Sequence, residues 1–188
     1  TQIGNRKGEG SCYGNLGNVF LALRKNKLAK EHFDKKLAIS IETGDRKSEG
    51  ECYASLANLY YLLNDYQKAT ELYEKSLSVS MNIGDRKGQG GSYLGHGHMS
   101  LSLGNYDESE KYFEDARSMS SKIGDNMTYF KSLLGITQVK ISQSKLEDAM
   151  QYLCQSIEIY EKLRNFLKGN DEFKTSLLEE HRSEERRV

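Results

Sequence analysis

Histidines and repeated Gly-Asp steps are the features of this chain whose residue types could bind a metal, carry out catalysis or hold a phosphate. His96 and His98 lie two residues apart. On a helix this spacing points them to nearly opposite faces, whereas a helical metal pair needs a spacing of three or four residues. The Ser, His and Asp residues do not lie in a nucleophile elbow or in any other sequence motif of a hydrolase active site. The sequence therefore predicts no metal site, no cofactor and no enzymatic activity.

The Gly-Asp steps belong to a short sequence motif that is repeated every forty residues. Its four copies are Ile3-Gly4-Asn5-Arg6-Lys7, Thr43-Gly44-Asp45-Arg46-Lys47, Ile83-Gly84-Asp85-Arg86-Lys87 and Ile123-Gly124-Asp125-Asn126. A phosphate-binding loop would need a preceding strand and another glycine spacing. The glycines instead suit a left-handed position just after a helix, and Asp45, Asp85 and Asp125, with Asn5 in the first unit, suit the N-cap of the next helix. The repeated motif therefore predicts a joint between helices.

A period of forty residues indicates stacked supersecondary units. Apolar residues of the second unit follow helical spacing twice: Tyr53, Leu56, Ala57, Tyr60 and Leu63, then Ala69, Leu72, Tyr73 and Leu77. Alternating apolar and polar runs are missing from the sequence, which excludes a β-propeller. Shorter turns inside the units are expected at Lys25-Asn26, Asn64-Asp65, Gly104-Asn105 and Gln143-Ser144. We predict an all-α chain with two helices in each unit.

The large and small residues of these helices form a signature. It reads Tyr13, Leu16-Gly17, Phe20, Ala29 and Phe33 in the first unit, and Tyr53, Leu56-Ala57, Tyr60, Ala69 and Tyr73 in the second. The third unit keeps Tyr93, Gly97 and Phe113 but has His96 and Ser109, and the fourth keeps only apolar character. From about residue 5 to about residue 163 the chain resembles the tetratricopeptide repeat family. Its long period is similar to that of the Pins/LGN G-protein-signalling modulators and of tetratricopeptide repeat protein 28-like proteins.

The resemblance implies a right-handed α-solenoid of about four helix-turn-helix repeats with a C-terminal capping helix. The expected segments are the end of a preceding joint at 1–4, repeats at 5–43, 44–83, 84–123 and 124–163, a capping helix at 164–180 and a frayed tail at 181–188. Phe173, Leu177 and Leu178 would form the capping stripe. Gly17, Ala57 and Gly97 are expected where the two helices of a repeat cross closely. A start without Met, inside a joint, indicates a piece of a longer polypeptide with more repeats before Thr1.

Composition and cysteine usage indicate a cytoplasmic protein. The 188 residues are 37% apolar, and 27 basic residues balance 27 acidic ones. No apolar run approaches the ~20 residues of a membrane helix, and no signal peptide opens the chain. Cys12 and Cys52 hold equivalent places in consecutive units, beyond disulfide reach, so they and Cys154 are interpreted as buried reduced thiols, with a redox pair as the alternative.

Basic residues are concentrated in the first unit. They include Arg24, Lys25, Lys27, Lys30, Lys35 and Lys36. Such a cluster could attract an acidic partner or nucleic acid, but RNA binding also needs exposed aromatic residues, and the aromatics here hold core positions. We interpret the cluster as a solvated outer face and predict no nucleic-acid partner.

The family resemblance also implies where a partner would bind. In tetratricopeptide arrays the residue after the small crossing residue points into a concave groove, which gives Asn18, Asn58, His98 and Gln138 here. All four are polar and formally neutral, and such a row can pair with the backbone of an extended peptide. The alternative is that these four polar residues only keep the groove hydrated and do not bind a peptide. The predicted groove residues are Asn15, Asn18, Leu21, Asn58, Tyr61, Leu94, His98, Leu101, Lys131 and Gln138.

The sequence therefore predicts a noncatalytic scaffold that binds an extended peptide segment of a protein partner. The competing prediction is a regulatory or self-associating arm of a larger signalling protein, with an effector or catalytic domain elsewhere.

Overall fold

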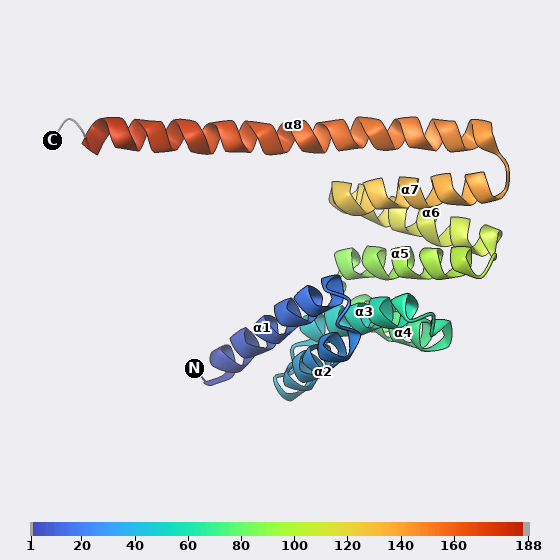
Figure 1. Ribbon diagram of the computed structural model, residues 1–188, viewed down its shortest axis with the longest axis horizontal. Helices are drawn as coiled ribbons and strands as arrows, with labels where there is room; N and C mark the ends of the chain where they lie inside the picture. Colours follow the sequence, from blue (N-terminus) through green and yellow to red (C-terminus); the bar gives the residue numbers. More distant parts are fainter. Residues whose placement is uncertain (1, 186–188) are drawn as a thin grey trace.

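The chain folds into α-helices joined by tight turns, and the described part contains no strand (Figure 1). The computed structural model describes the backbone of residues 2–185 and the side chains of residues 5–166, 168 and 169. The helices are α1 (Gln2–Ala22), α2 (Asn26–Glu42), α3 (Arg46–Leu62), α4 (Tyr66–Asn82), α5 (Arg86–Ser102), α6 (Tyr106–Ile123), α7 (Asn126–Ser142) and α8 (Leu146–Glu185).

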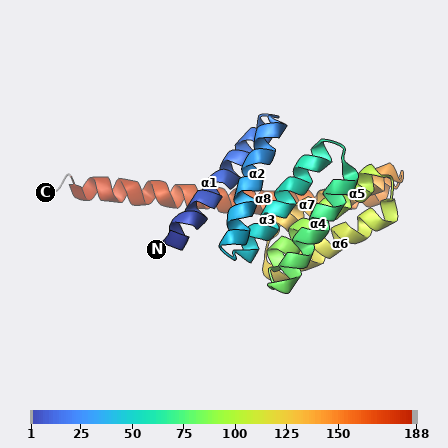
Figure 2. The ribbon, with the colours of Figure 1, turned by 90° about the horizontal axis from the view of Figure 1, so that it is seen from below.

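Successive helices pack in pairs, and the pairs stack into an array (Figures 1 and 2). The first helices of the pairs, α1, α3, α5 and α7, also contact one another from pair to pair. Within the described residues, the second helices α2, α4, α6 and α8 make no such contacts. The first helices therefore line the inner side of the curve, as in other curved repeat arrays. This arrangement confirms the predicted all-α solenoid.

The joints between pairs use the predicted glycine and aspartate. The glycines are left-handed, with φ of +65° at Gly44, +69° at Gly84 and +71° at Gly124. The next residue caps the following helix by accepting a backbone N–H: Ser48 donates to Asp45, Gly88 to Asp85 and Thr128 to Asp125. Left-handed backbone is cheap for glycine, and the carboxylate satisfies an otherwise free donor. Each joint is therefore set by local chemistry.

Two boundaries in the first pair differ from the expectation. Asn5 lies inside α1 and does not cap it, because α1 already begins at Gln2 and Gly4 is a helical residue. The turn within the pair lies one residue earlier than expected, with the left-handed backbone at Arg24 (φ 57°), so Asn26 already begins α2.

The last helix is longer than expected. A separate capping helix over 164–180 was predicted, but α8 runs unbroken from Leu146 to Glu185 and extends well past α7 (Figure 1). Arg164 and Asn165 stand where the earlier joints have Gly and Asp, so the left-handed stop is missing and the helix continues. The expected tail is helical to Glu185, and residues 186–188 lie outside the described residues. The stripe of Phe173, Leu177 and Leu178 lies outside the described side chains.

The core is divided among the contacts between pairs. Three clusters of buried residues join each second helix to the first helix of the next pair. They are Ala29, Phe33 and Leu56; Ala57, Ala69, Tyr73 and Met99; and Leu94, Phe113, Ala116, Ile136 and Val139. Each pair therefore depends on its neighbour to bury apolar surface.

Small residues make room for the aromatic ring in the third cluster. A Cβ added to Gly97, on the same pair, would lie 2.6 Å from the Phe113 ring, and one added to Gly135, on the next pair, would lie 2.5 Å from it. Ser109, which replaces the family's Ala, is buried and donates to the Gly97 carbonyl at 2.7 Å. The Phe113 ring is thus enclosed by two glycines from successive first helices.

We predict that Gly97→Leu and Gly91→Leu have opposite effects on stability, although both change a glycine of α5. The added side chain at Gly97 meets the buried Phe113 ring, and overpacking of this kind costs about 1–3 kcal/mol or more. Nothing lies within 4 Å of a Cβ at the exposed Gly91, so its replacement should gain about 0.5–1 kcal/mol of helix propensity. Urea unfolding of both variants measures the difference. Equal stabilities would contradict the close helix crossing.

Candidate functional site

The candidate site is a row of four polar residues on the inner helices. Asn18, Asn58, His98 and Gln138 lie on α1, α3, α5 and α7, forty residues apart. Each of the four comes directly after a buried residue at the helix crossing. Consecutive residues of an α-helix are about 100° apart around its axis, so each of the four side chains points away from the crossing. Asn18, Asn58 and Gln138 are exposed, and His98 is half-buried. The row therefore repeats once per helix pair.

Asn58 is held by an aromatic residue from the second helix of its pair. The Tyr73 ring is buried against Ala57 and Gly95, and its hydroxyl donates to Asn58 Oδ1 at 2.5 Å. Burial raises the pKa of the Tyr73 hydroxyl, which keeps it protonated and a donor. Because Tyr73 occupies one of the two lone pairs of the Asn58 oxygen, the side-chain NH₂ is the group of Asn58 that this contact leaves fully available to a ligand. Sequence reasoning missed this role of Tyr73.

His98 has an analogous neighbour. Its ring lies edge-on to the Phe113 ring, with the centroids 5.0 Å apart. Burial lowers the pKa of His98, and the nearby ammonium of Lys131 lowers it further. His98 therefore stays neutral at neutral pH, with one ring nitrogen able to donate and the other able to accept.

The remaining predicted groove residues differ in how much surface they offer. Lys131 is exposed, while Leu21 and Leu101 are half-buried against the core clusters. Tyr61 is half-buried, and its hydroxyl lies 2.9 Å from Ser102 Oγ, which joins α3 to α5 on the inner side. Leu94 is buried in the cluster around Phe113, so it packs between helices and does not line an open groove.

Asn15 lies on a different face from the row. The equivalent residues in later pairs, Gly95 and Gly135, face the preceding second helix, where they contact Tyr73 and Phe113. Asn15 has the same register on α1 and is exposed, because no helix precedes α1 in the described residues. Asn15 therefore lies on the side of α1 that corresponds to the contact between pairs, away from the row.

His96 is a packing residue. It is buried in the place that Leu56 and Ile136 hold in the neighbouring pairs. Its ring stacks on Tyr112 with the centroids 5.0 Å apart and lies 5.7 Å from the Tyr73 ring. Burial lowers the pKa of His96, although Glu74 and Glu108 act in the opposite direction. In the residues that the structure describes, no group of three or more His, Cys, Asp or Glu side chains could hold a metal ion.

The cysteines differ from the prediction that all three are buried. Cys52 is buried in α3, and burial raises the pKa of its thiol to about 11. Cys12 holds the same register on α1 but is exposed, since within the described residues no helix covers this side of α1, and Cys154 on α8 is also exposed. All three are free thiols.

The pattern of repeats is shared with known proteins. A family model described as tetratricopeptide repeat matches residues 10–81 and 90–162. No curated protein sequence matches the chain. Among the described residues, no helix is both long enough and apolar enough to cross a bilayer.

Solved structures with similar folds have low sequence identity. Aspartyl phosphate phosphatase F from Bacillus subtilis is 15% identical with a TM-score of 0.77, and the match covers 84% of this chain and 42% of that one. A Rap protein complexed with competence and sporulation factor is 16% identical with a TM-score of 0.75, covering 85% and 43%. A signal transduction ATPase with a tetratricopeptide repeat sensor from Pyrococcus horikoshii is 20% identical with a TM-score of 0.70, covering 88% and 26%. The chain thus spans less than half of each of these proteins, and the likeness concerns the fold.

We predict that His96, which is buried, and His98, which is half-buried, make the protein less stable as the pH falls below 6.5. Their ordinary pKa is 6.5, and burial lowers it in the folded state. The unfolded chain therefore binds protons first, and stability is lost as the pH falls from 6.5 through the folded pKa values. Urea unfolding at about pH 7.5 and about pH 5.5 measures the loss, since most carboxylates remain ionised in that window.

The double variant His96→Leu, His98→Asn should lose most of this pH dependence. Leucine is the residue that the first two pairs have at the position of His96. If the double variant loses as much stability on acidification as the parent chain does, the histidines are not the cause.

Proposed function

The chain belongs to the tetratricopeptide repeat family, and on this basis we propose that it is a protein-interaction scaffold whose inner surface binds an extended peptide segment of a partner. An array of this kind presents a long concave surface because each pair adds one inner helix. The proposal rests above all on the row of Asn18, Asn58, His98 and Gln138, which places one neutral polar group on each inner helix.

Neutrality of the row favours a peptide backbone as the ligand. Backbone amides need both donors and acceptors, and an amide side chain can supply both to one residue of an extended strand. Asn58 would donate to a peptide carbonyl, because Tyr73 engages its oxygen. The neutral ring of His98 would pair with the peptide without the cost of burying a charge.

The surroundings of the row supply specificity. Tyr61 and Leu101 are half-buried on the inner helices, and Lys131 is exposed close to His98. A partner with apolar side chains and an acidic group near the third and fourth pairs would fit these residues. A Rap protein of similar fold forms a complex with competence and sporulation factor, which supports such an array as a binding module. We place the interaction in the cytoplasm, where exposed thiols such as Cys12 stay reduced.

The row can be tested with peptides selected from a displayed random library on the immobilised chain. In the double variant Asn18→Ala, Gln138→Ala, each lost hydrogen bond should cost about 0.5–1.5 kcal/mol, so affinity for a selected peptide should fall about tenfold. These two residues are preferred to Asn58, because Asn58→Ala would also leave the buried Tyr73 hydroxyl without its acceptor. Titration calorimetry measures the affinity.

The matched control is Gln67→Ala, Asn82→Ala, which removes two exposed amide side chains from the outer helix α4. Its affinity should stay within about twofold of the parent value. A second comparison, Lys27→Ala, Lys30→Ala, changes the basic outer face of α2. If the lysine variant loses more affinity than the Asn18 and Gln138 variant, and high salt abolishes the difference, the partner binds the outer face and the proposal is wrong.

A further inference from the structure

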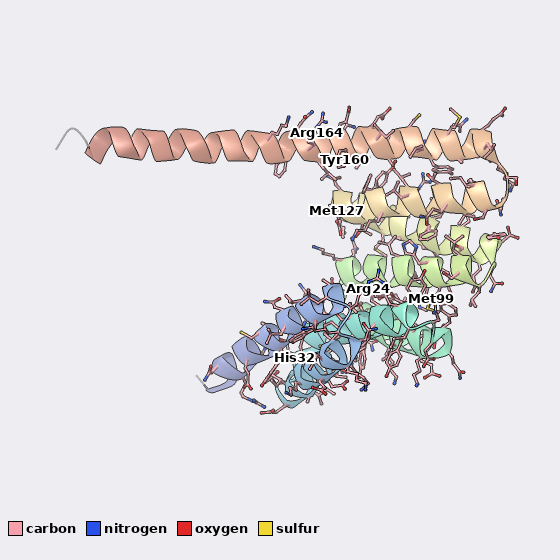
Figure 3. The ribbon with its side chains drawn as sticks, in the orientation of Figure 1. Arg24, His32, Met99, Met127, Tyr160 and Arg164 are labelled. Carbon is pink, nitrogen blue, oxygen red and sulfur yellow. The ribbon has the colours of Figure 1, made fainter. Side chains whose placement is uncertain are left out.

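A cleft of about 700 Å³ lies where α8 passes the joint between α6 and α7. The apolar side chains that line it come from three helices and are those of Ile123, Met127, Leu163 and Phe166. Met127 lies at the end of α7 that is next to the extension of α8 (Figure 3). Met127 is 51% exposed and Phe166 is 68% exposed, although both side chains are large and apolar. The described part of the chain therefore leaves an apolar wall against which a bulky side chain of a partner can pack.

The cleft is a consequence of the unbroken α8. By the forty-residue period, Leu163 holds the place of Ile123, directly before a joint, and Phe166 holds the place of Asn126, at which α7 begins. After Ile123 the chain turns at a left-handed glycine, whereas after Leu163 it continues as a helix. This continuation carries Phe166 to a position where it lines the cleft together with Met127. The helix that replaces a joint thus forms one wall of the cleft.

Basic residues at the start of the first pair are neutralised inside the chain. Arg6 pairs with Glu9 at 2.6 Å and also with Glu42 at the end of α2. Lys7, the next residue, pairs with Asp45 at 3.6 Å. These ion pairs leave little net positive charge at the first joint.

The same positions of the third pair carry an excess of positive charge. Arg86 holds the register of Arg6, but Gln89 stands in the place of Glu9 and Lys122 stands in the place of Glu42. In the fourth pair this last position is again a lysine, Lys162 of α8. Because neither glutamine nor lysine can neutralise a guanidinium, the charge balance of the first joint is lost beside the cleft.

Two of the positive groups line the cleft itself. Lys87 of α5 and Lys162 of α8 are both exposed there, and among the described residues no ion pair joins either ammonium group to a carboxylate. Asp125 also lines the cleft, but its carboxylate accepts the Thr128 backbone N–H at 3.2 Å and the Thr128 hydroxyl at 2.8 Å. The cleft therefore combines an apolar wall with ammonium groups that can pair with carboxylates of another molecule.

We propose that this cleft is a docking site for an acidic segment of a partner protein, in which a bulky apolar residue lies between carboxylates. The apolar residue packs against Met127 and Phe166, and the carboxylates pair with Lys87 and Lys162. The site does not depend on the polar row. Gln138, the member of the row on α7, lies about three helical turns from Met127, so the cleft and the row bind different segments.

Fluorescence anisotropy with short labelled peptides tests the chemistry of the partner. The probe has one phenylalanine between two glutamates on each side, and both of its ends are blocked so that they carry no charge. One comparison peptide has serine in place of the phenylalanine, and the other has lysines in place of the glutamates. The probe should bind about tenfold or more tightly than either. A probe that does not bind, or a serine peptide that binds equally well, overturns the proposal.

Two double variants locate the bound probe. Met127→Gln, Phe166→Gln removes the apolar wall, and Lys87→Glu, Lys162→Glu reverses the charge of the cleft. Each should weaken binding of the probe by about tenfold or more, and the effect of the charge reversal should shrink at high salt. All four side chains are exposed, so thermal melts should show that both variants are folded.

Matched controls change equally exposed side chains elsewhere. Met81→Gln, Leu103→Gln alters two apolar residues that are 56% and 53% exposed, and Lys47→Glu, Lys111→Glu makes the same change in net charge as the reversed cleft. Both controls should bind the probe within about twofold of the parent affinity. If the lysine control loses as much affinity as the reversed cleft, the probe responds to overall charge and the cleft is not its site.

The variant Asn18→Ala, Gln138→Ala separates this site from the polar row. It should bind the probe as the parent chain does, because neither residue lines the cleft. If this variant loses the probe while both cleft variants retain it, the probe binds the row and the docking site is wrong. If the cleft variants alone lose it, the docking site holds even where the row binds no peptide.

Discussion

The arrangement depends on how aromatic rings from the second helices are enclosed by small residues on the first helices. Phe113 is held between Gly97 and Gly135, and Tyr73 lies against Ala57 and Gly95. Each ring thus touches the inner helix of its own pair and that of the next. The ring fills the space between the two inner helices only when both of them approach it closely. The packing of one ring therefore sets both the helix crossing within a pair and the stacking of that pair on the next.

The same contact connects the core to the inner surface. The Tyr73 ring is buried, yet its hydroxyl reaches Asn58, and the Phe113 ring supports the edge of His98. Asn58 and His98 are therefore positioned by buried aromatics, which limits the rotamers of these two side chains. Such preorganisation lowers the entropic cost of binding. In the second and third pairs, buried core aromatics and residues of the polar row are therefore in direct contact.

The contact between pairs repeats along the array, and within the described residues no helix covers the outer faces of α1 and α8. Leu16 and Val19 of α1 and Leu153 of α8 are exposed, although the equivalent residues of the helices between them are buried. The straight extension of α8 does not cover either face in the described part of the chain. Repetition therefore produces one continuous inner surface, which α1, α3, α5 and α7 form together.

The sequence by itself determined the features that depend on neighbouring residues in the chain. The period, the paired helices and the Gly-Asp joints could all be predicted, because helix periodicity, left-handed glycine and N-capping act within a few residues. Even the unbroken α8 has a local cause in Arg164 and Asn165, although the prediction missed it. Only the tertiary structure decided that Asn58 is engaged by Tyr73, that Leu94 is buried, and that Asn15 and Cys12 face outward. Those outcomes depend on which helix packs against each residue, and the presence or absence of that helix is not encoded in the residue's own neighbourhood.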